Sequence, residues 1–190
     1  MVITVQSEID FNILITGVRD GDTGAIRDLW AIYNPIMLRY ASVLSRDLAD
    51  DICQDSWIAI ARNIHRFKGD KDQFVRYIFT IARNRATDYA RAGYRRDNLA
   101  RHYYEMDTAR AGVDIDNEYK GESAELARYL QTLSPLVAEM IFLKFAAGLT
   151  TEEISDFLGR SQANVRVAIH RGLAKLRDHY AIVRDAVSSS

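Results

Sequence analysis

Near its C-terminus the sequence contains a helix-start signal, a turn signal and a second helix-start signal within a dozen residues. Thr150 and Glu153 have the spacing of a capping box, in which each side chain hydrogen-bonds to the backbone N–H of the other residue. Gly159 permits a tight turn, and Ser161 is a suitable N-cap for the helix that follows. This combination predicts two helices joined by a short turn, at residues 151–158 and 162–179.

The second predicted helix has two contrasting sides. Its apolar residues recur at steps of four, four and three and form one stripe: Val165, Ile169, Leu173 and Leu176. At about 100° per residue, the opposite side and its flanks, which we call the outer face, carry short or polar side chains. The outer face comprises Arg160, Ser161, Gln162, Asn164, Arg166, Val167, His170 and Arg171, with Ala163 and Ala174 between them.

This outer face suits insertion into the major groove of DNA. Asn164 can make a two-pronged contact with adenine and Arg171 with guanine, and Val167 can touch the methyl group of thymine. Arg160 and Arg166 are better placed to contact phosphates. We therefore predict a DNA-reading helix-turn-helix. The alternative is an ordinary helical hairpin whose outer face is solvated.

A third amphipathic helix is predicted at residues 47–65. Its apolar side carries Ala49, Ile52, Cys53, Trp57, Ile60 and Ile64, and we interpret the single cysteine as a small core residue. Beyond Asp47, the other side presents residues at i, i+3, i+4 and i+7 that form what we call the acidic ridge: Asp51, Gln54, Asp55 and Ile58. An exposed isoleucine among carboxylates suits the docking of another helix. The alternative is a solvated acidic face with one stray isoleucine.

A long helix is predicted at residues 73–93. Its buried stripe contains Phe74, Val75, Ile78, Phe79, Ala82, Ala86 and Tyr89. The opposite side, which we call the polar face, contains Arg76, Tyr77, Thr80, Arg83, Asn84, Thr87 and Arg91. Such a face can follow a phosphate backbone while its polar groups address bases, and the preceding loop at residues 67–72, with Lys68, could hold an unstacked base. The alternative is a solvated basic helix.

Basic residues are concentrated in the middle of the chain. Residues 62–101 contain eleven arginines and lysines and four carboxylates, and the segments before and after this block are acidic. A basic block between acidic ones is typical of a phosphate-binding surface. Charge alone fits a solvated helix face equally well.

Helical periodicity fades after the long helix, where carboxylates and glycines gather. Pro35 marks a break or a helix start within the first 45 residues. Two further helices are predicted at 123–132 and 135–146, on either side of Ser134-Pro135. We therefore predict an all-α protein with two small helical domains joined by a flexible acidic linker. The predicted bounds are 8–95, 96–122 and 123–180.

Several classes of protein are not supported by the sequence. The four histidines are scattered without metal-ligand spacing, and no phosphate-loop glycine pattern exists, so we predict no catalytic residue, no metal and no cofactor. No run of about 18 apolar residues occurs, so no membrane insertion is expected. The N-terminus lacks a basic region followed by an apolar run. We therefore expect a cytoplasmic protein.

Three segments together resemble one protein family. Residues 47–58, DLADDICQDSWI, resemble the sigma-70 family segment that binds the clamp helices of the RNA polymerase β′ subunit. Residues 74–91, FVRYIFTIARNRATDYAR, are similar to the segment of the extracytoplasmic-function (ECF) group that melts and reads the −10 promoter element. Residues 133–176 resemble the sigma-4 domain that reads the −35 element. The resemblance identifies the chain as an ECF sigma factor with a sigma-2-like and a sigma-4-like domain.

The resemblance implies a function without catalysis by this chain. It implies binding to core RNA polymerase through the β′ clamp helices and the β subunit, with Asp47 and the acidic ridge at the clamp. The outer face would read duplex −35 DNA. The polar face and Lys68 would capture a flipped base of the single-stranded −10 element, and the polymerase would perform the chemistry. An anti-sigma partner is common in the family.

The chain departs from the family pattern on the predicted recognition helix. ECF recognition helices usually carry Gly-Thr where this chain has Ala163-Asn164, and often Ser-Arg where it has Val167-Ala168. We interpret these departures as a distinct −35 preference. The rival function is a stand-alone helix-turn-helix transcriptional regulator. It would need a dimer seam or a sensing pocket, and neither stands out in the sequence.

Overall fold

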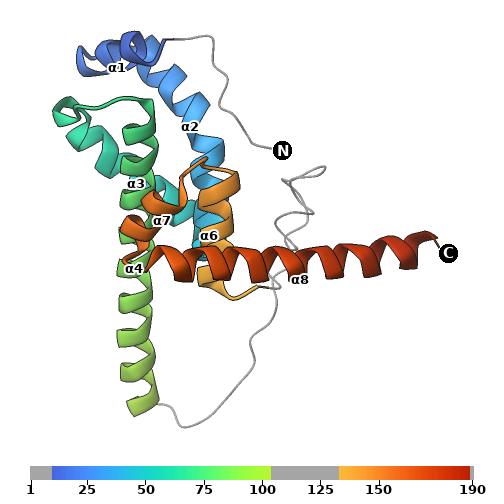
Figure 1. The fold of residues 1–190 in the computed structure, drawn as a ribbon. Helices are drawn as coiled ribbons and strands as arrows, with labels where there is room; N and C mark the ends of the chain where they lie inside the picture. The colour runs from blue at the N-terminus through green and yellow to red at the C-terminus, as the bar shows by residue number, and fades with distance from the viewer. Residues whose placement is uncertain (1–9, 104–132, 189–190) are drawn as a thin grey trace.

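The computed structural model describes residues 10–103 and 133–188, with side chains described over residues 10–93 and 133–177. Within these ranges every regular element is a helix (Figure 1). The elements are α1 (Phe11–Arg19), α2 (Thr23–Leu44), α3 (Ala49–Asn63), the short 3-10 helix η1 (Ile64–Arg66), α4 (Lys71–Tyr103), α6 (Pro135–Phe145), α7 (Thr151–Leu158) and α8 (Gln162–Ser188). The predicted all-α fold is therefore confirmed.

Helices α1 to α4 form an N-terminal unit around one apolar core. Asp10 and Asp22 cap α1 and α2, because their carboxylates accept hydrogen bonds from backbone N–H groups at each helix start. The most deeply buried large side chains of this unit are Tyr33, Met37, Tyr40, Ile52, Ile60, Phe74, Ile78 and Phe79. Burial of each such side chain stabilises the fold by about 1.5–3 kcal/mol. Cys53 is buried among them, as predicted.

Helix α2 corrects the prediction at Pro35, because it runs through the proline without a break. Proline lacks an N–H and crowds the preceding turn, which normally kinks or ends a helix. Here Pro35 itself is exposed, but Tyr33, Ile36 and Met37 around it are buried. Packing of these neighbours holds the segment helical, which a local pattern cannot reveal.

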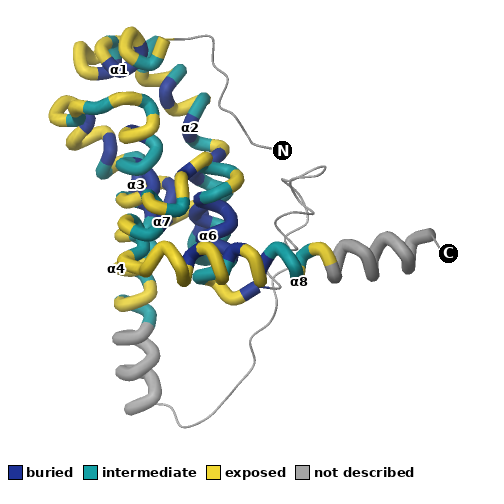
Figure 2. Tube along the Cα trace, in the orientation of Figure 1, coloured by how far each residue is buried: buried dark blue, intermediate teal, exposed yellow. Residues whose placement is uncertain are grey.

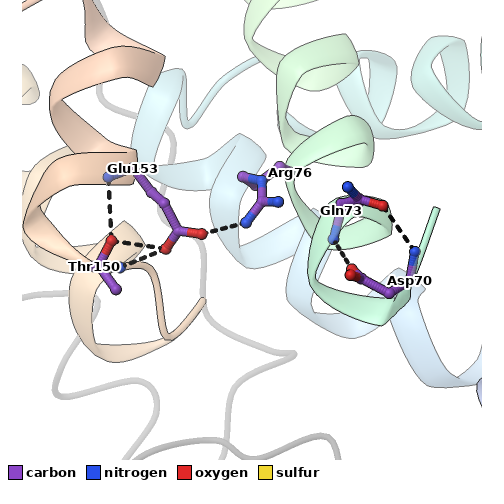
Figure 3. Close-up of polar contacts among 5 residues, drawn as sticks. All are labelled: Asp70, Gln73, Arg76, Thr150 and Glu153. Carbon is purple, nitrogen blue, oxygen red and sulfur yellow. Dashed lines mark hydrogen bonds and ion pairs between the residues drawn. The ribbon is translucent and has the colours of Figure 1, made fainter.

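Helix α4 is longer than predicted at both ends. Asp70 caps it two residues early: the Gln73 N–H donates to Asp70 Oδ1 at 2.8 Å, and the Asp70 N–H donates to Gln73 Oε1 at 2.9 Å (Figure 3). At the other end the helix continues to Tyr103, so the first eight residues of the predicted linker are helical. Residues 94–103 contain neither proline nor glycine, and arginine and alanine favour helix. The rest of that linker and the helix predicted at 123–132 lie outside the described residues.

Helices α6 to α8 form a C-terminal unit with the predicted helix-turn-helix. The capping box is present, with the Glu153 N–H donating to Thr150 Oγ1 at 3.2 Å and the Thr150 N–H donating to Glu153 Oε2 at 2.8 Å. Gly159 adopts a left-handed φ of 61°, which few other residues adopt without strain. Helix α8 reaches Ser188, beyond its predicted end.

Helix α8 crosses α6 at Gly172. A Cβ atom at this position would lie 2.6 Å from Val137 Cγ1 and 2.7 Å from Ile141 Cδ1, so a side chain here would force these neighbours to shift. In the predicted stripe of α8, Val165 and Ile169 are buried and the next two members are half-buried. The orientation of α8 on α6 is therefore set where the backbone of α8 at Gly172 contacts the side chains of Val137 and Ile141.

The two units share one core, because α6 packs against α2 (Figure 1). The ring centroid of Tyr40 lies 4.7 Å from that of Phe79 and 5.5 Å from that of Phe142, and Phe79 and Phe142 are 6.0 Å apart. In Figure 2 the buried segments gather along α6 and inside α1–α4, whereas the first turns of α8 are largely exposed. Among the described helices, none is long and apolar enough to cross a membrane.

Candidate polymerase and nucleic-acid interfaces

The acidic ridge lies on the surface of α3. Asp51 and Gln54 are exposed, and Ile58 is an apolar side chain on the same surface that is 43% exposed. Asp47 is exposed in the turn before the helix. Two carboxylates in the first turn, at Asp50 and Asp51, also favour helix formation through the helix dipole.

Asp55 differs from the rest of the ridge, because another helix holds its carboxylate. The hydroxyl of Tyr89, on α4, donates to Asp55 Oδ2 at 2.9 Å. This hydrogen bond, together with burial and the nearby negative charge of Asp55, raises the pKa of Tyr89 above its usual value. The sequence pattern assigned Tyr89 to the buried stripe of α4. In the structure it is half-buried and orients a ridge carboxylate.

An open pocket of about 680 Å³ lies between the loop at residues 67–70 and the middle of α4. Lys68, Tyr77 and Asn84, which the sequence singled out, all line it. Phe67, from the loop predicted to hold the base, lines it as well, and the pocket is completed by residues that the sequence did not indicate: Ala59, Asn63, Arg66, Ile81 and Arg85. The Phe67 ring lies 5.3 Å from that of Tyr77, so the pocket has an aromatic wall and cationic edges.

Two polar contacts and one steric requirement fix the conformation of the loop beside this pocket. The Arg19 guanidinium, on α1, donates to the backbone carbonyl of Phe67. The capping interaction of Asp70 with Gln73 fixes the end of the loop where α4 begins. At Gly69 a Cβ atom would lie 2.5 Å from Gln73 Oε1, so only glycine fits without a shift. Arg19 lies far from the loop in sequence, and no local pattern could have indicated this contact.

The polar face of α4 is divided into exposed and covered parts. Thr80, Asn84, Thr87 and Arg91 are exposed. The hydroxyls of Thr80 and Thr87 donate to the carbonyls one turn earlier, at 2.8 and 2.9 Å. Arg76 and Arg83 are half-buried, and both form ion pairs with carboxylates of the C-terminal unit. Sequence reasoning missed these pairs, because the partners lie 77 and 56 residues away.

The first of these pairs joins Arg76 to Glu153 (Figure 3). Both side chains are about one-third exposed, at 32% and 33%. The backbone N–H of Thr150 lowers the pKa of Glu153 most, burial opposes this effect, and the Thr150 hydroxyl and the charge of Arg76 lower it further. Glu153 therefore serves two purposes, because one carboxylate caps α7 and pairs with α4.

The second pair is buried. Glu139 is 4% exposed, and its Oε1 accepts hydrogen bonds from the Arg83 guanidinium and from the Tyr40 hydroxyl at 2.6 Å. Burial raises the pKa of Tyr40 well above its usual range, and the charge and hydrogen bond of Glu139 raise it further. Burial tends to lower the pKa of Arg83, but Glu139 raises it overall. Arg83 also lies over the Phe157 ring, 6.0 Å from its centroid.

The outer face of α8 is exposed from Arg160 to Arg171, whereas Ala174, the last residue predicted to face outward, is half-buried. Its members are Arg160, Ser161, Gln162, Asn164, Arg166, Val167, His170 and Arg171, and each is exposed. Ser161 acts as the predicted N-cap, accepting from the Asn164 N–H at 3.3 Å. A groove of about 490 Å³ runs beside this face and is lined by Asn164, Val167 and Arg171 together with Val137 of α6. The rotational setting of α8 therefore agrees with the one predicted from the apolar stripe.

Two segments of the chain match family models. Residues 29–96 match Sigma-70 region 2, and residues 123–176 match Sigma-70, region 4. The RNA polymerase sigma factor CarQ of Myxococcus xanthus is 31% identical over 163 residues, covering 84% of this chain and 91% of the relative. The chain is a sigma-70 family member of the ECF group.

Other relatives of this sigma factor carry the ECF designation. The ECF RNA polymerase sigma-E factor of Haemophilus influenzae is 30% identical over 168 residues, covering 83% of this chain and 88% of the relative. The ECF RNA polymerase sigma factor ShbA of Streptomyces griseus is 29% identical over 169 residues, with 83% and 88% covered. Family membership gives the chain a general role in promoter-directed transcription by RNA polymerase.

Two solved structures have the same fold as this sigma factor. RpoE of Bartonella quintana, in complex with the anti-sigma factor NepR, aligns with a TM-score of 0.56 at 19% identity, covering 80% of this chain and 94% of that one. CnrH, in complex with the cytosolic domain of CnrY, aligns with a TM-score of 0.57 at 22% identity, covering 90% and 96%. At these identities the likeness concerns the fold alone.

Proposed function

We propose that this sigma factor binds core RNA polymerase through the acidic ridge and directs it to promoters by reading two DNA elements. In this proposal the outer face of α8 reads the duplex −35 element, and the pocket beside α4 holds an unstacked base of the −10 element. The observation that carries the proposal is the pocket itself. It combines an aromatic wall, an exposed asparagine and several cations within one open cavity.

The chemistry of the pocket fits a base flipped out of the duplex. The rings of Phe67 and Tyr77 offer stacking surfaces, and stacking of a base on an aromatic ring is worth about 1–3 kcal/mol. The Asn84 amide can both donate to and accept from a base edge. Lys68, at the rim, suits a backbone phosphate. Such contacts offset the few kcal/mol that unstacking requires.

The −35 part of the proposal rests on the exposed outer face. Asn164 and Arg171 line the same groove and are the two side chains able to make two-pronged contacts with bases. Arg160 and Arg166 are exposed on its flanks, where phosphates are the expected partners. Ala163-Asn164 and Val167-Ala168 depart from the usual family residues, so we propose a −35 preference that differs from that of typical ECF factors.

The partners in this proposal are all macromolecules. The acidic ridge would dock on the β′ clamp helices, with Ile58 as the apolar anchor, and the C-terminal unit would contact the β subunit. The two solved relatives are complexes with NepR and with CnrY, which supports the further proposal of an anti-sigma partner for this chain. The polymerase supplies the catalytic chemistry, and among the described residues there is no cluster of potential metal ligands.

Pull-down with core RNA polymerase, followed by transcription in vitro, tests the proposal. The informative variant is Ile58→Glu, and the matched control is Ile26→Glu, which alters an isoleucine of similar exposure on α2, 46% against 43%. We expect Ile58→Glu to weaken core binding by about tenfold or more, as for an interface anchor. The control should bind normally, and circular dichroism should be unchanged in both. Equal binding by the two variants, or tight sequence-specific binding of duplex DNA by the free chain, would contradict the proposal.

A further inference from the structure

One residue of the pocket's aromatic wall, Phe67, is hydrogen-bonded to a helix outside the pocket. The Arg19 guanidinium, at the C-terminal end of α1, donates to the backbone carbonyl of Phe67, 48 residues away in the sequence. Arg19 itself does not line the pocket. We propose that Arg19 is a positioning residue for capture of the −10 base: it holds Phe67 in the conformation that receives a base and does not contact DNA. This role rests on the proposed −10 function of the pocket, and the experiments below separate the two.

Both backbone polar groups of Phe67 are paired. Its N–H donates to the Ile64 carbonyl at 3.0 Å, which closes η1, and its carbonyl accepts from Arg19. At Phe67 the chain leaves the helical conformation, with a φ of −65° and a ψ of 127°. Because each peptide group is planar, the two hydrogen bonds fix the backbone on both sides of the Phe67 Cα atom. They therefore limit the directions in which its ring can point.

The Phe67 ring lies between the core and the pocket. It meets Phe74 edge-on with ring centroids 5.4 Å apart, and it is tilted against Tyr77 at 5.3 Å. Phe74 is fully buried, whereas Tyr77 lines the pocket. Stacking depends on the angle and offset between rings. A small rotation of the Phe67 backbone would therefore change the surface that the pocket offers to a base.

The loop needs contacts at both ends, because its middle contains a glycine. At Gly69 a Cβ atom would lie 2.9 Å from Phe67 Cζ, so the ring requires the absence of a side chain there. Glycine has more backbone freedom than any other residue. Asp70 and Gln73 fix the loop where α4 begins. Arg19 acts at the opposite end, at the residue whose ring forms the wall.

Arginine at the end of α1 suits this task. The C-terminal end of a helix favours a cation through the helix dipole. A hydrogen bond from a guanidinium to a carbonyl is charge-assisted and therefore stronger than one between neutral groups. Arg19 also precedes the segment that matches the Sigma-70 region 2 model, residues 29–96. Helix α1 thus contributes to the loop a contact that lies outside the matched segment.

The test compares Arg19→Ala and Arg19→Lys in the full-length chain bound to core polymerase. Lysine keeps the charge and a donor, and alanine removes both. The matched control is Arg27→Ala on α2, which removes an arginine whose side chain is 77% exposed and pairs with the adjacent Asp28. Permanganate reactivity of unpaired thymines measures promoter opening, and fluorescence anisotropy measures promoter binding over a range of salt concentrations. Arg19→Met, which has no donor, replaces the alanine variant if circular dichroism shows a loss of fold.

We expect Arg19→Ala to reduce promoter opening about fivefold, because fewer molecules hold the loop in the conformation that receives a base. Arg19→Lys should lose less, and Arg27→Ala should open the promoter as wild type does. Promoter affinity and its salt dependence should not change, since no phosphate contact is removed. Weaker binding with a smaller salt dependence would mean that Arg19 contacts DNA directly, which overturns the proposal. Wild-type opening by Arg19→Ala also overturns it.

An abasic nucleotide in the promoter distinguishes base capture from a general loss of loop structure. It is placed at each position of the non-template −10 strand in turn. At the captured position there is no base for Phe67 to receive, so Arg19→Ala and wild type should open this template equally. A defect of Arg19→Ala that persists on every abasic template would show that the residue acts elsewhere, and the proposal would then fail.

The variant Asn84→Ala separates this role from the proposed function. Asn84 lines the pocket directly, whereas Arg19 acts only through the loop. If Asn84→Ala reduces promoter opening and Arg19→Ala does not, the pocket keeps its function and the positioning role of Arg19 is rejected. If neither variant reduces promoter opening, both the pocket function and the positioning role are rejected.

Discussion

The two faces proposed to read DNA differ in what lies over them. On α8 the outer face is exposed from Arg160 to Arg171, and within the part of the chain that the structure describes none of these side chains forms an ion pair. On α4 the polar face contains two arginines that are half-buried and paired with carboxylates of the other unit. Two chemically similar faces can thus differ in how far the rest of the chain covers them. The outer face is open to solvent, whereas two arginines of the polar face already have carboxylate partners within the chain.

The largest expected effect tests whether the two units share one apolar core beside the polar face of α4. Phe142→Ala removes a buried ring between the two units, whereas Phe145→Ala removes one that is 43% exposed on the same helix. We expect the first to lower the free energy of unfolding by about 3–5 kcal/mol and the second to change it little. Urea denaturation followed by circular dichroism measures both. Similar small effects would mean that the units do not pack on each other in solution.

The next prediction concerns the uncovered face. Arg171→Ala should relax the preference at one −35 base pair, since a two-pronged contact discriminates by about 1–3 kcal/mol. Arg166→Ala should lower transcription evenly across sequences, because a phosphate carries no base identity. A randomised −35 library transcribed by each mutant holoenzyme distinguishes these results. If Arg166 changes base preference and Arg171 does not, the rotational assignment of α8 is wrong.

A smaller effect is expected at the pocket beside the polar face of α4. Asn84→Ala removes an amide that lines the pocket, and we expect promoter opening to fall by about fivefold, as for the loss of one hydrogen bond. Promoter binding should change less, because the phosphate contacts remain. Permanganate reactivity of unpaired thymines measures the opening, and Asn12→Ala, which removes an exposed amide on α1 outside every proposed site, is the control. Wild-type reactivity in Asn84→Ala would remove the pocket from the mechanism.

The smallest prediction is a pH dependence at the contact between the units. The folded state lowers the pKa of Glu153, so this group stabilises the fold above its usual pKa of about 4.5. That stabilisation is lost as the pH falls through the lower folded value. Because the side chain is one-third exposed, we expect less than about 1 kcal/mol. Urea titrations between about pH 6 and pH 3 should show a shallower loss for Glu153→Gln than for wild type or Glu152→Gln.

Local signals predicted most of the helices, and tertiary contacts account for the differences. The capping box, Gly159 and Ser161 give the start and end of α7 and the start of α8 without reference to the rest of the chain. The local sequence does not predict that α2 continues through Pro35, because its buried neighbours pack against helices that lie far away in the sequence, as Tyr33 does against Phe74. The end of α4 differs from the prediction because a charge-rich segment without an apolar stripe can still be helical.

The candidate sites divide in the same way. Exposure of the outer face and of the acidic ridge follows from helical periodicity, because one apolar stripe fixes what points outward. The pairing of Arg83 with Glu139 could not be predicted, since nothing in the local pattern of α6 indicates which helix it packs against. The hydrogen bond from Arg19 to the backbone of the loop that borders the pocket could not be predicted for the same reason.

The crossing of α6 and α8 at Gly172 bears on how new promoter preferences can arise in descendants of this protein. Under the proposed function, substitutions at Asn164, Val167 or Arg171 would change what the helix recognises but would remove no packing, because these side chains are exposed. A side chain at Gly172 would require either Val137 and Ile141 or α8 itself to shift, and a shift of α8 would move all the residues proposed to read DNA together. The exposed residues of α8 can therefore vary during evolution without loss of packing. The glycine at position 172, on the opposite side, maintains the orientation of all of them at once.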